Sequence, residues 1–235
     1  KWALGTVAIT QPSAGPDPTV YDQTFSSAAS LAVQMMTLEI GWNDLAGSPF
    51  SKTISGAMVD KFSLSGKVGE LVQASFDVVG SAFTVATTKT TPTYAAGLTP
   101  FSWAGGSLTL GGSSADISGL QIDVANNLDA DRFYLGSATR KQPLAPQMLI
   151  TGTCDGDFSD WTAYNRFLNG TFATLVCNFD GATISNSYKY SLQVTMNVRT
   201  DGDTPSLSGP GRIGNPLKFT AFDSGSGPSS ALSVR

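Results

Sequence analysis

Histidine is absent from the 235-residue chain, and this absence excludes several kinds of catalytic site. Without histidine there are no Ser-His or Cys-His nucleophilic pairs, no HExxH zinc sites and no histidine-based acid–base chemistry. The two cysteines cannot by themselves supply the four ligands of a closed structural zinc site. The hydrolase motifs GxSxG and SxxK are absent as well. We therefore expect no catalytic residue, no metal ligand and no cofactor.

Charged residues are also scarce, at 14% of the chain, and the net charge is −4. The 14 Lys and Arg residues form no basic run, which argues against sequence-specific binding to duplex DNA. No run of about 18 apolar residues occurs, so we expect no transmembrane helix and no membrane partner. The acids are almost all Asp, which favours turns and caps, rather than Glu, which favours helices.

The plentiful residues are those of strands and turns: Ser and Thr together number 53, beside 25 Gly and 12 Pro. This composition predicts many short strands joined by turns. Strands and helices do not alternate along the chain, which argues against a parallel α/β sheet. We therefore expect a mainly β protein with an antiparallel sandwich or barrel-like fold. Its length suits one domain over residues 1–235, with residues 224–235 as a flexible Ser/Gly tail.

Two neighbouring segments alternate polar and apolar residues with a period of two. Val59–Ser65 and Glu70–Val79 show this pattern, and Gly66–Gly69 separate them, so we predict a half-buried hairpin. Asn43–Gly56, just before it, is rich in turn-forming residues and is expected to be a loop. Further strands are expected at Val7–Thr10, Met35–Gly41, Phe83–Thr93, Gly105–Gly112, Ile117–Asn126, Gln147–Gly156, Thr171–Phe179, Tyr188–Arg199 and Leu217–Phe222.

A single segment, Asp157–Asn169, is typical of a helix. Asp157 or Ser159 can cap its first turn, and Gly170 suits its C-terminal end. Its apolar stripe consists of Trp161, Tyr164, Phe167 and Leu168. The sequence thus predicts one short helix beside the strands.

Three Asp-x-Asp pairs resemble fragments of cation-binding loops, because alternate carboxylates can chelate Ca²⁺ or Mg²⁺. None continues into an EF-hand loop and all lie near turns, so turn formation is the favoured interpretation. The pairs are Asp129/Asp131, Asp155/Asp157 and Asp201/Asp203.

Two other motifs have ordinary structural explanations. Gly209–Gly214 matches GxGxxG, but Pro210 and Pro216 exclude the helix start that a dinucleotide site needs. Cys154 and Cys177 lie on two predicted strands and either form a disulfide or remain as buried thiols. The lack of a visible secretion signal favours the thiols.

The aromatic residues leave a carbohydrate-binding or glycan-hydrolysing β-domain open as an alternative. Most of them lie on predicted core faces, so packing is the favoured role. Glycoside hydrolysis would need two carboxylates about 5 Å apart, which the sequence does not locate. The aromatic residues in question are Trp42, Trp103, Trp161, Phe62, Phe76, Phe133, Tyr134 and Phe167.

Taken together, the ordered segments resemble the tail tube proteins of long-tailed, siphophage-type bacteriophages. The resemblance spans about residues 35 to 222 and consists of degenerate strand motifs. Family members usually have a further stretch before the segment matching Leu38–Trp42, which indicates that the N-terminal part is incomplete. The resemblance rests on Leu38–Trp42, Val59–Gly66, Gly69–Gly80, Ile117–Leu128, Leu149–Thr153, Trp161–Phe167 and Tyr190–Arg199 with the Gly/Pro loop that follows.

The resemblance implies a β-sandwich or barrel-like tube fold with a flanking helix. Six copies would form a ring, and the rings would stack into a hollow tail that conducts DNA. The implied partners are further copies of the chain and other tail proteins, such as the tape measure and terminator proteins. The implied location is the virion tail, assembled in the host cytoplasm. Another phage structural β-protein, such as a coat, decoration or tail-terminator subunit, is the nearest alternative.

Within this expectation, two loops and one sheet face are candidate functional surfaces. Thr87–Phe101 and Asp201–Pro216 are long, polar and rich in Pro and Gly, which is typical of loops that contact neighbouring subunits. We expect the tube lumen to be acidic and poor in Lys and Arg, since repulsion of the phosphates would keep DNA from adhering. The candidate contact residues are Thr87, Thr91, Tyr94, Phe101, Asp201, Asp203 and Arg212. The candidate lumen residues are Lys61, Ser63, Gln73, Ser75 and Asp77.

Overall fold

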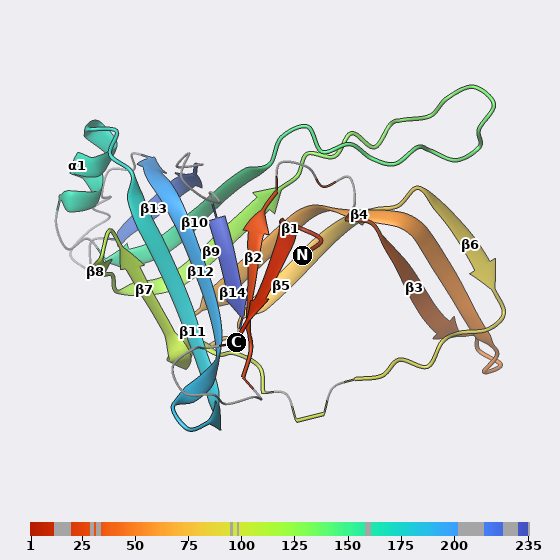
Figure 1. The fold of residues 1–235 in the computed structure, drawn as a ribbon, viewed down its shortest axis with the longest axis horizontal. Helices are drawn as coiled ribbons and strands as arrows, with labels where there is room; N and C mark the ends of the chain where they lie inside the picture. Colours follow the sequence, from red (N-terminus) through yellow and green to blue (C-terminus); the bar gives the residue numbers. More distant parts are fainter. Residues whose placement is uncertain are drawn as a thin grey trace.

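The structure is a computed structural model that describes residues 1–11, 20–28, 31, 34–94, 96–97, 99–157, 161–201, 214–222 and 230–234. Antiparallel strands dominate it, arranged as a sandwich-like body from which an arm projects (Figure 1). The prediction of a mainly β, antiparallel fold with one short helix is therefore confirmed. The described part of the chain contains no helix with the length and apolar character needed to cross a membrane.

The first sheet of the body has the strand order β5–β4–β9–β10–β13. Its strands are antiparallel. A short turn joins β4 to β5, whereas the loop of residues 126–148 joins β9 to β10. The expected hairpin is confirmed as the β4–β5 pair, in which Lys61 lies opposite Asp77. The bounds are β4 Pro49–Lys67, β5 Gln73–Val79, β9 Ile117–Ala125, β10 Leu149–Asp157 and β13 Gly214–Ala221.

The second sheet has the order β1–β2–β14–β12–β11–β7–β8. Strand β12 joins the two sheets, because its last residues also pair with β13 of the first sheet. The 3-10 turn η1, Trp103–Gly105, leads into β7. The bounds are β1 Gly5–Thr10, β2 Asp22–Ser27, β7 Gly106–Leu110, β8 Ser113–Ser114, β11 Ala173–Ser185, β12 Tyr188–Asp201 and β14 Ser230–Val234.

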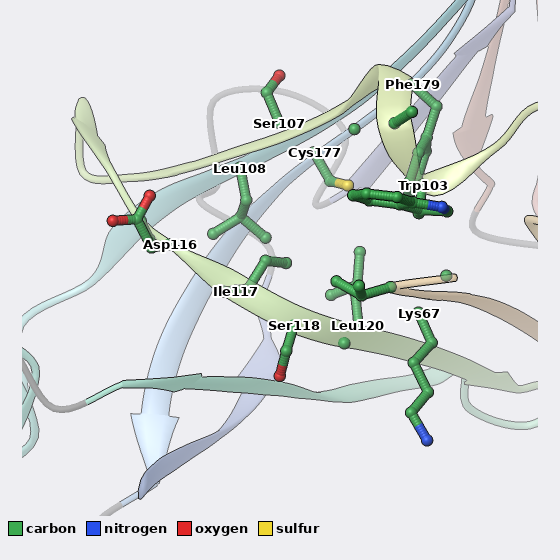
Figure 2. A pocket seen from close by; sticks show the side chains of 16 residues that line it. Lys67, Trp103, Ser107, Leu108, Asp116, Ile117, Ser118, Leu120, Cys177 and Phe179 are labelled. Atoms are coloured by element: carbon green, nitrogen blue, oxygen red, sulfur yellow. The ribbon is translucent and has the colours of Figure 1, made fainter. Parts of the chain in front are cut away.

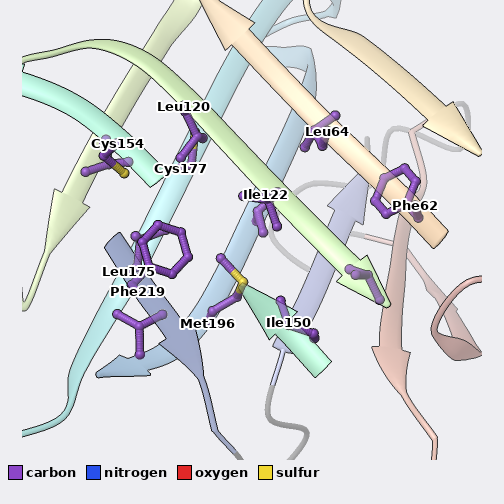
Figure 3. Close-up of a cluster of buried hydrophobic side chains, with 14 of the residues drawn as sticks. Phe62, Leu64, Leu120, Ile122, Ile150, Cys154, Leu175, Cys177, Met196 and Phe219 are labelled. Atoms are coloured by element: carbon purple, nitrogen blue, oxygen red, sulfur yellow. The ribbon is translucent and has the colours of Figure 1, made fainter. Parts of the chain in front are cut away.

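The core lies between these sheets and follows the alternation of their strands. Leu120 and Ile122 of β9 face Leu175 and Met196 of the second sheet (Figure 3). Gln121 and Asp123 lie between the inward residues and point to the opposite face, as period-two alternation requires. Burial of these apolar side chains is the main force that holds the sheets together.

The arm is a three-stranded sheet made by β3 (Met36–Asn43), the first half of β4, and β6 (Ala82–Ala86). Strand β4 runs without interruption from the arm into the body (Figure 1). The expectation of a loop over Asn43–Gly56 is therefore wrong from Pro49 onward. Strand pairing on both edges of β4 outweighs the turn-forming tendency of its Ser, Thr and Gly residues.

Hydrogen bonds hold the junction between arm and body. The side chain of Asn126, fully buried, donates to the carbonyl oxygens of Val59 at 2.9 Å and Ala3 at 3.1 Å. The carboxylate of Asp60 accepts from the backbone N–H of Leu128 at 2.8 Å. These bonds surround the register shift in the β4–β5 pair between Val59 and Lys61, and they fix where the arm leaves the body.

Helix α1, Thr162–Leu168, is shorter than predicted and differs at its N-terminus. Asp157 belongs to β10, Ser159 lies outside the described residues, and the N-cap position is taken by Trp161 without a side-chain cap bond. No residue of the helix is buried, so its apolar stripe is largely exposed rather than part of the core. The aromatic rings of Trp161 and Tyr164 instead contact each other edge to face.

The two chain ends also differ from expectation. Ser230–Val234 were expected within a flexible tail, but they form β14 between β12 and β2. Residues 224–229 and 235 lie outside the described residues. Strand β2 was not predicted, because its sequence DQTFSS has too few apolar residues to show alternation. The segment is a strand because its backbone pairs with β1 on one side and with β14 on the other.

Cys154 and Cys177 are buried free thiols, as the sequence favoured. Burial raises the pKa of each thiol from 9.0 to about 12, because the thiolate loses its hydration. Between these pH values the unfolded chain releases two protons that the folded chain retains. The free energy of unfolding therefore falls as the pH rises through this window.

We predict that the free energy of unfolding falls less with rising pH in the Cys154→Ala/Cys177→Ala variant, which lacks both thiols. Urea unfolding of both proteins at about pH 8 and about pH 10.5 measures the difference between their pH slopes. The variant will be less stable at both pH values because it carries cavities, so only the slopes are compared. Equal slopes would contradict burial of the thiols.

A second prediction concerns Gly152, which packs against the ring of Phe219. A Cβ at this position would lie 2.3 Å from Cζ of Phe219 and 2.6 Å from the carbonyl oxygen of Gln121. Gly152→Ala should therefore destabilise the fold by about 1–3 kcal/mol through overpacking. Gly214→Ala is the control, since no atom of the described residues lies within 4 Å of its added Cβ. Thermal unfolding tests the pair, and equal losses would refute the packing described here.

Candidate functional surfaces

The outer face of the first sheet is largely polar, with Ala125 and the exposed Leu149 as its apolar members in the row of Lys61 and Asp77. In one row across it, Ser75, Ser63 and Asp123 lie opposite one another on β5, β4 and β9. The row continues through Thr151 of β10 and Thr220 of β13. The next row consists of Gln73, Ser65, Gln121, Thr153 and Lys218. We call this surface the polar face.

All five candidate lumen residues lie on the polar face. Lys61 pairs with Asp77, Ser63 with Ser75, and Gln73 with Ser65. The structure thus brings together the residues that the sequence placed on one side of a hairpin. It also extends their surface over three further strands, which no local pattern in the sequence could show.

Asp123 is at the centre of a hydrogen-bond network on the polar face. The hydroxyl of Ser63 donates to its Oδ1 at 2.6 Å, and the amide of Gln121 donates to its Oδ2 at 2.9 Å. Charge-assisted bonds of this kind hold a carboxylate in one orientation. The centre of the surface is therefore composed of fixed, short polar groups.

Charges of opposite sign are balanced on the polar face. By alternation and register it carries Lys61, Lys67, Lys218 and Arg199 together with Asp77, Asp123, Asp155 and Asp201. Several are direct neighbours, as Lys61 is of Asp77 and Lys218 of Asp201. The surface is therefore neither basic nor acidic overall.

Strand β5 forms one edge of the first sheet, since in the described residues it pairs only with β4. On the opposite side of β5 from the polar face, Phe76 and Val78 are exposed. Unpaired backbone groups and apolar side chains on an edge strand are features that a monomer normally avoids. This edge is therefore a candidate contact with another chain.

The structure describes only part of the two loops that were predicted to contact neighbouring subunits. Thr87, Thr91 and Tyr94 are exposed, on a segment that runs beside β3 of the arm. Phe101 instead packs against the core, and Asp201 ends β12 opposite Lys218. Asp203 and Arg212 lie outside the described residues.

The expectation that most candidate aromatics pack in the core is wrong. Phe62 is buried, whereas the other seven are exposed on the arm, the loops, β5 and the helix. Alternation cannot reveal this, because whether an apolar face is covered depends on a second element. The exposed residues are Trp42, Phe76, Trp103, Phe133, Tyr134, Trp161 and Phe167.

The described residues contain no group of three or more Cys, Asp or Glu arranged to hold a metal ion. In the first Asp pair, Asp129 accepts a bond from the backbone N–H of Asp131 at 3.3 Å, which is the geometry of a turn. The described residues thus combine a polar sheet face with exposed apolar side chains at an edge strand.

Comparison with known proteins agrees with this description. The family model of the phage tail tube proteins matches residues 3–221. The chain belongs to the phage tail tube protein family. A search of curated proteins finds no significant match.

The family assigns this tail tube protein a structural role in the phage tail, where it assembles with itself and with other tail proteins. This is a virion component rather than a member of a known enzyme family. The earlier resemblance to tail tube proteins is thereby confirmed. The matched range includes strands β1 to β13 of the body and the arm.

The segment beside the arm is held by Glu39, whose carboxylate accepts from the backbone N–H of Thr90 at 2.8 Å and from its hydroxyl at 2.6 Å. These bonds lower the pKa of Glu39, the hydroxyl of Thr90 contributing most. A lowered pKa means that the contact is complete above the ordinary pKa of Glu and is lost as the pH falls through the lowered value.

We predict that Thr90→Ala raises the pKa of Glu39 toward its ordinary value, because the strongest hydrogen bond is removed. Thr91→Ala is the control and should leave that pKa unchanged. Titration of the Glu39 carboxyl by NMR measures both. If the pKa in Thr90→Ala equals that of the parent chain, Thr90 does not hold the segment against the arm.

Proposed function

We propose that the chain is the subunit of closed rings, six copies to a ring, which stack into the hollow tail tube through which DNA passes. The observation that carries the proposal is the polar face, a largely polar surface with short side chains at its centre that ends at the edge strand β5. Membership of the tail tube family supports it. The polar face would line the lumen.

The chemistry of the polar face suits passage of a polyanion. Binding of DNA phosphates requires clustered Lys and Arg that displace counterions. Here the cations lie beside carboxylates, and the centre consists of Ser, Thr and Gln around Asp123. The sequence led us to expect an acidic lumen; the proposed surface is instead neutral and mixed in sign. It offers DNA neither a binding site nor a strong barrier.

The unpaired edge of β5 supports closure of the ring. An edge strand that pairs with the next copy would continue the first sheet from subunit to subunit. A head-to-tail contact of this type closes into a ring when the rotation per subunit divides the circle. Phe76 and Val78, exposed on the other side of β5, would then be covered by the neighbour.

Further partners follow from the same proposal. The tube would enclose the tape measure protein and would end at the terminator protein, in a tail assembled in the host cytoplasm. The exposed segment with Thr87, Thr91 and Tyr94 would contact neighbouring subunits. None of these contacts requires a catalytic group or a cofactor.

Labelling of engineered cysteines in assembled tubes tests the lumen assignment. Gln73→Cys places a thiol on the polar face, and Gln193→Cys places a matched thiol on β12 of the second sheet; both glutamines are exposed. The native cysteines are buried and do not interfere. A bulky maleimide–polymer should label both variants as monomers, but in tubes only Gln193→Cys.

Electron microscopy must first show rings or tubes for the parent chain and for both variants. Chains that stay monomeric at high concentration would refute the proposed assembly. Tubes in which Gln73→Cys is labelled as readily as Gln193→Cys would refute the lumen assignment alone.

A further inference from the structure

A groove lies between the arm and the loop of residues 126–148, which projects above β6 at the upper right of Figure 1. Its volume is about 400 Å³. The arm contributes Lys52, Ile54 and Phe83, and the loop contributes Phe133 and Arg140. We call it the arm groove.

The arm groove combines apolar surface with positive charge. The ammonium of Lys52 lies 4.4 Å from the centre of the Phe83 ring, and the guanidinium of Arg140 lies 5.4 Å from that of Phe133. Stacking on the rings holds each cation in place. These two are the only charged residues among those described in the groove lining. The occupant that fits is apolar and negatively charged.

A surface of that chemistry exists at the other end of β4. After β4 ends at Lys67, a turn exposes Val68 and Leu71 with Glu70 between them. Asp116 lies nearby, on the margin of a cleft of about 320 Å³ that also includes Lys67 and Val68. We call the turn together with Asp116 the acidic rim.

Figure 2 shows the cleft behind the acidic rim. Leu108, Ile117 and Leu120 gather between the ring of Trp103 and the carboxylate of Asp116. Trp103 is exposed and extends the apolar part of this surface. Lys67 also lines the cleft, but its ammonium points away from Trp103 and Asp116 (Figure 2). The rim thus offers apolar side chains with the carboxylates of Glu70 and Asp116 at their margin, which complements the arm groove.

The turn is held rigidly by backbone hydrogen bonds. The N–H of Val68 donates to Ser118 at 2.9 Å, and that of Glu70 donates to Lys67 at 3.0 Å. The carbonyl of Glu70 accepts from Trp103 at 3.3 Å. A turn that is already ordered loses little conformational entropy when it binds.

We propose that the arm groove of one copy binds the acidic rim of a second copy. The inference rests on the proposed function, which it extends by naming the two surfaces that meet. The groove and the rim lie toward opposite ends of the single strand β4, so one molecule cannot satisfy its own contact. The contact is heterologous, and each bound copy presents a free groove or rim to the next.

Charge reversal tests the contact. The groove variant is Lys52→Glu/Arg140→Glu, and the rim variant is Glu70→Lys/Asp116→Lys. Each should raise the protein concentration needed for assembly roughly tenfold or more, because like charges then face each other. Sedimentation and electron microscopy measure that concentration. Lys189→Glu, an exposed change on β12 away from both surfaces, is the control and should assemble as the parent does.

Rescue separates a lost contact from a lost fold. The variant that combines all four substitutions restores opposite charges and should assemble near the parent concentration. A mixture of groove and rim variants should also assemble, because each supplies the complement of the other. Circular dichroism and size-exclusion chromatography confirm that each unassembled variant is folded.

The outcomes distinguish this inference from the proposed function. If the parent chain forms no rings or tubes, the proposed function fails. If the parent assembles and both double variants assemble equally well, the pairing of arm groove and acidic rim is wrong. If each double variant is defective but the combined variant is not restored, the two surfaces contact different partners, and the proposal is again overturned.

Discussion

The continuous pairing of strand β4 is the constraint on which the rest of the structure depends. Its 19 residues hydrogen-bond to β3 and β6 in the arm and to β5 and β9 in the body. Because side chains alternate along a strand, one face of the body half turns Leu64 into the core and the other carries Lys61 and Ser63 on the surface. The point where arm and body meet is held by the hydrogen bond that Asn126 donates to Val59 and by the one that Asp60 accepts from Leu128.

This arrangement separates two tasks that a tube subunit must perform. The body buries a core of apolar side chains between two sheets, and this burial stabilises its fold. The arm, the edge of β5 and the acidic rim leave apolar side chains exposed, which is unfavourable for an isolated molecule. The proposed assembly would cover such surfaces, so that the same apolar burial that folds the body would favour association of the subunits.

Much of the body was predictable because its pattern is local. Alternation in Ile117–Ala125 and Gln73–Val79 identifies strands and their faces without knowledge of any partner. In the arm, the sequence indicated strands at Met35–Gly41 and Phe83–Thr93 but not the strand between them. Pro49–Gly56 has the composition of a loop and becomes a strand only between β3 and β6. The stripe of α1 suggested burial, but no second element covers it.

The sequence by itself determined which kinds of catalytic site the chain lacks. It also determined which residues of a strand point to the same side. Absence of histidine and scarcity of charge exclude most catalytic sites, and alternation is a property of neighbouring residues. Only the tertiary structure decided which polar residues share a surface, because the register between β4, β9 and β10 joins residues far apart in the chain. It also decided which apolar side chains stay exposed, since burial depends on the element packed opposite rather than on the residue.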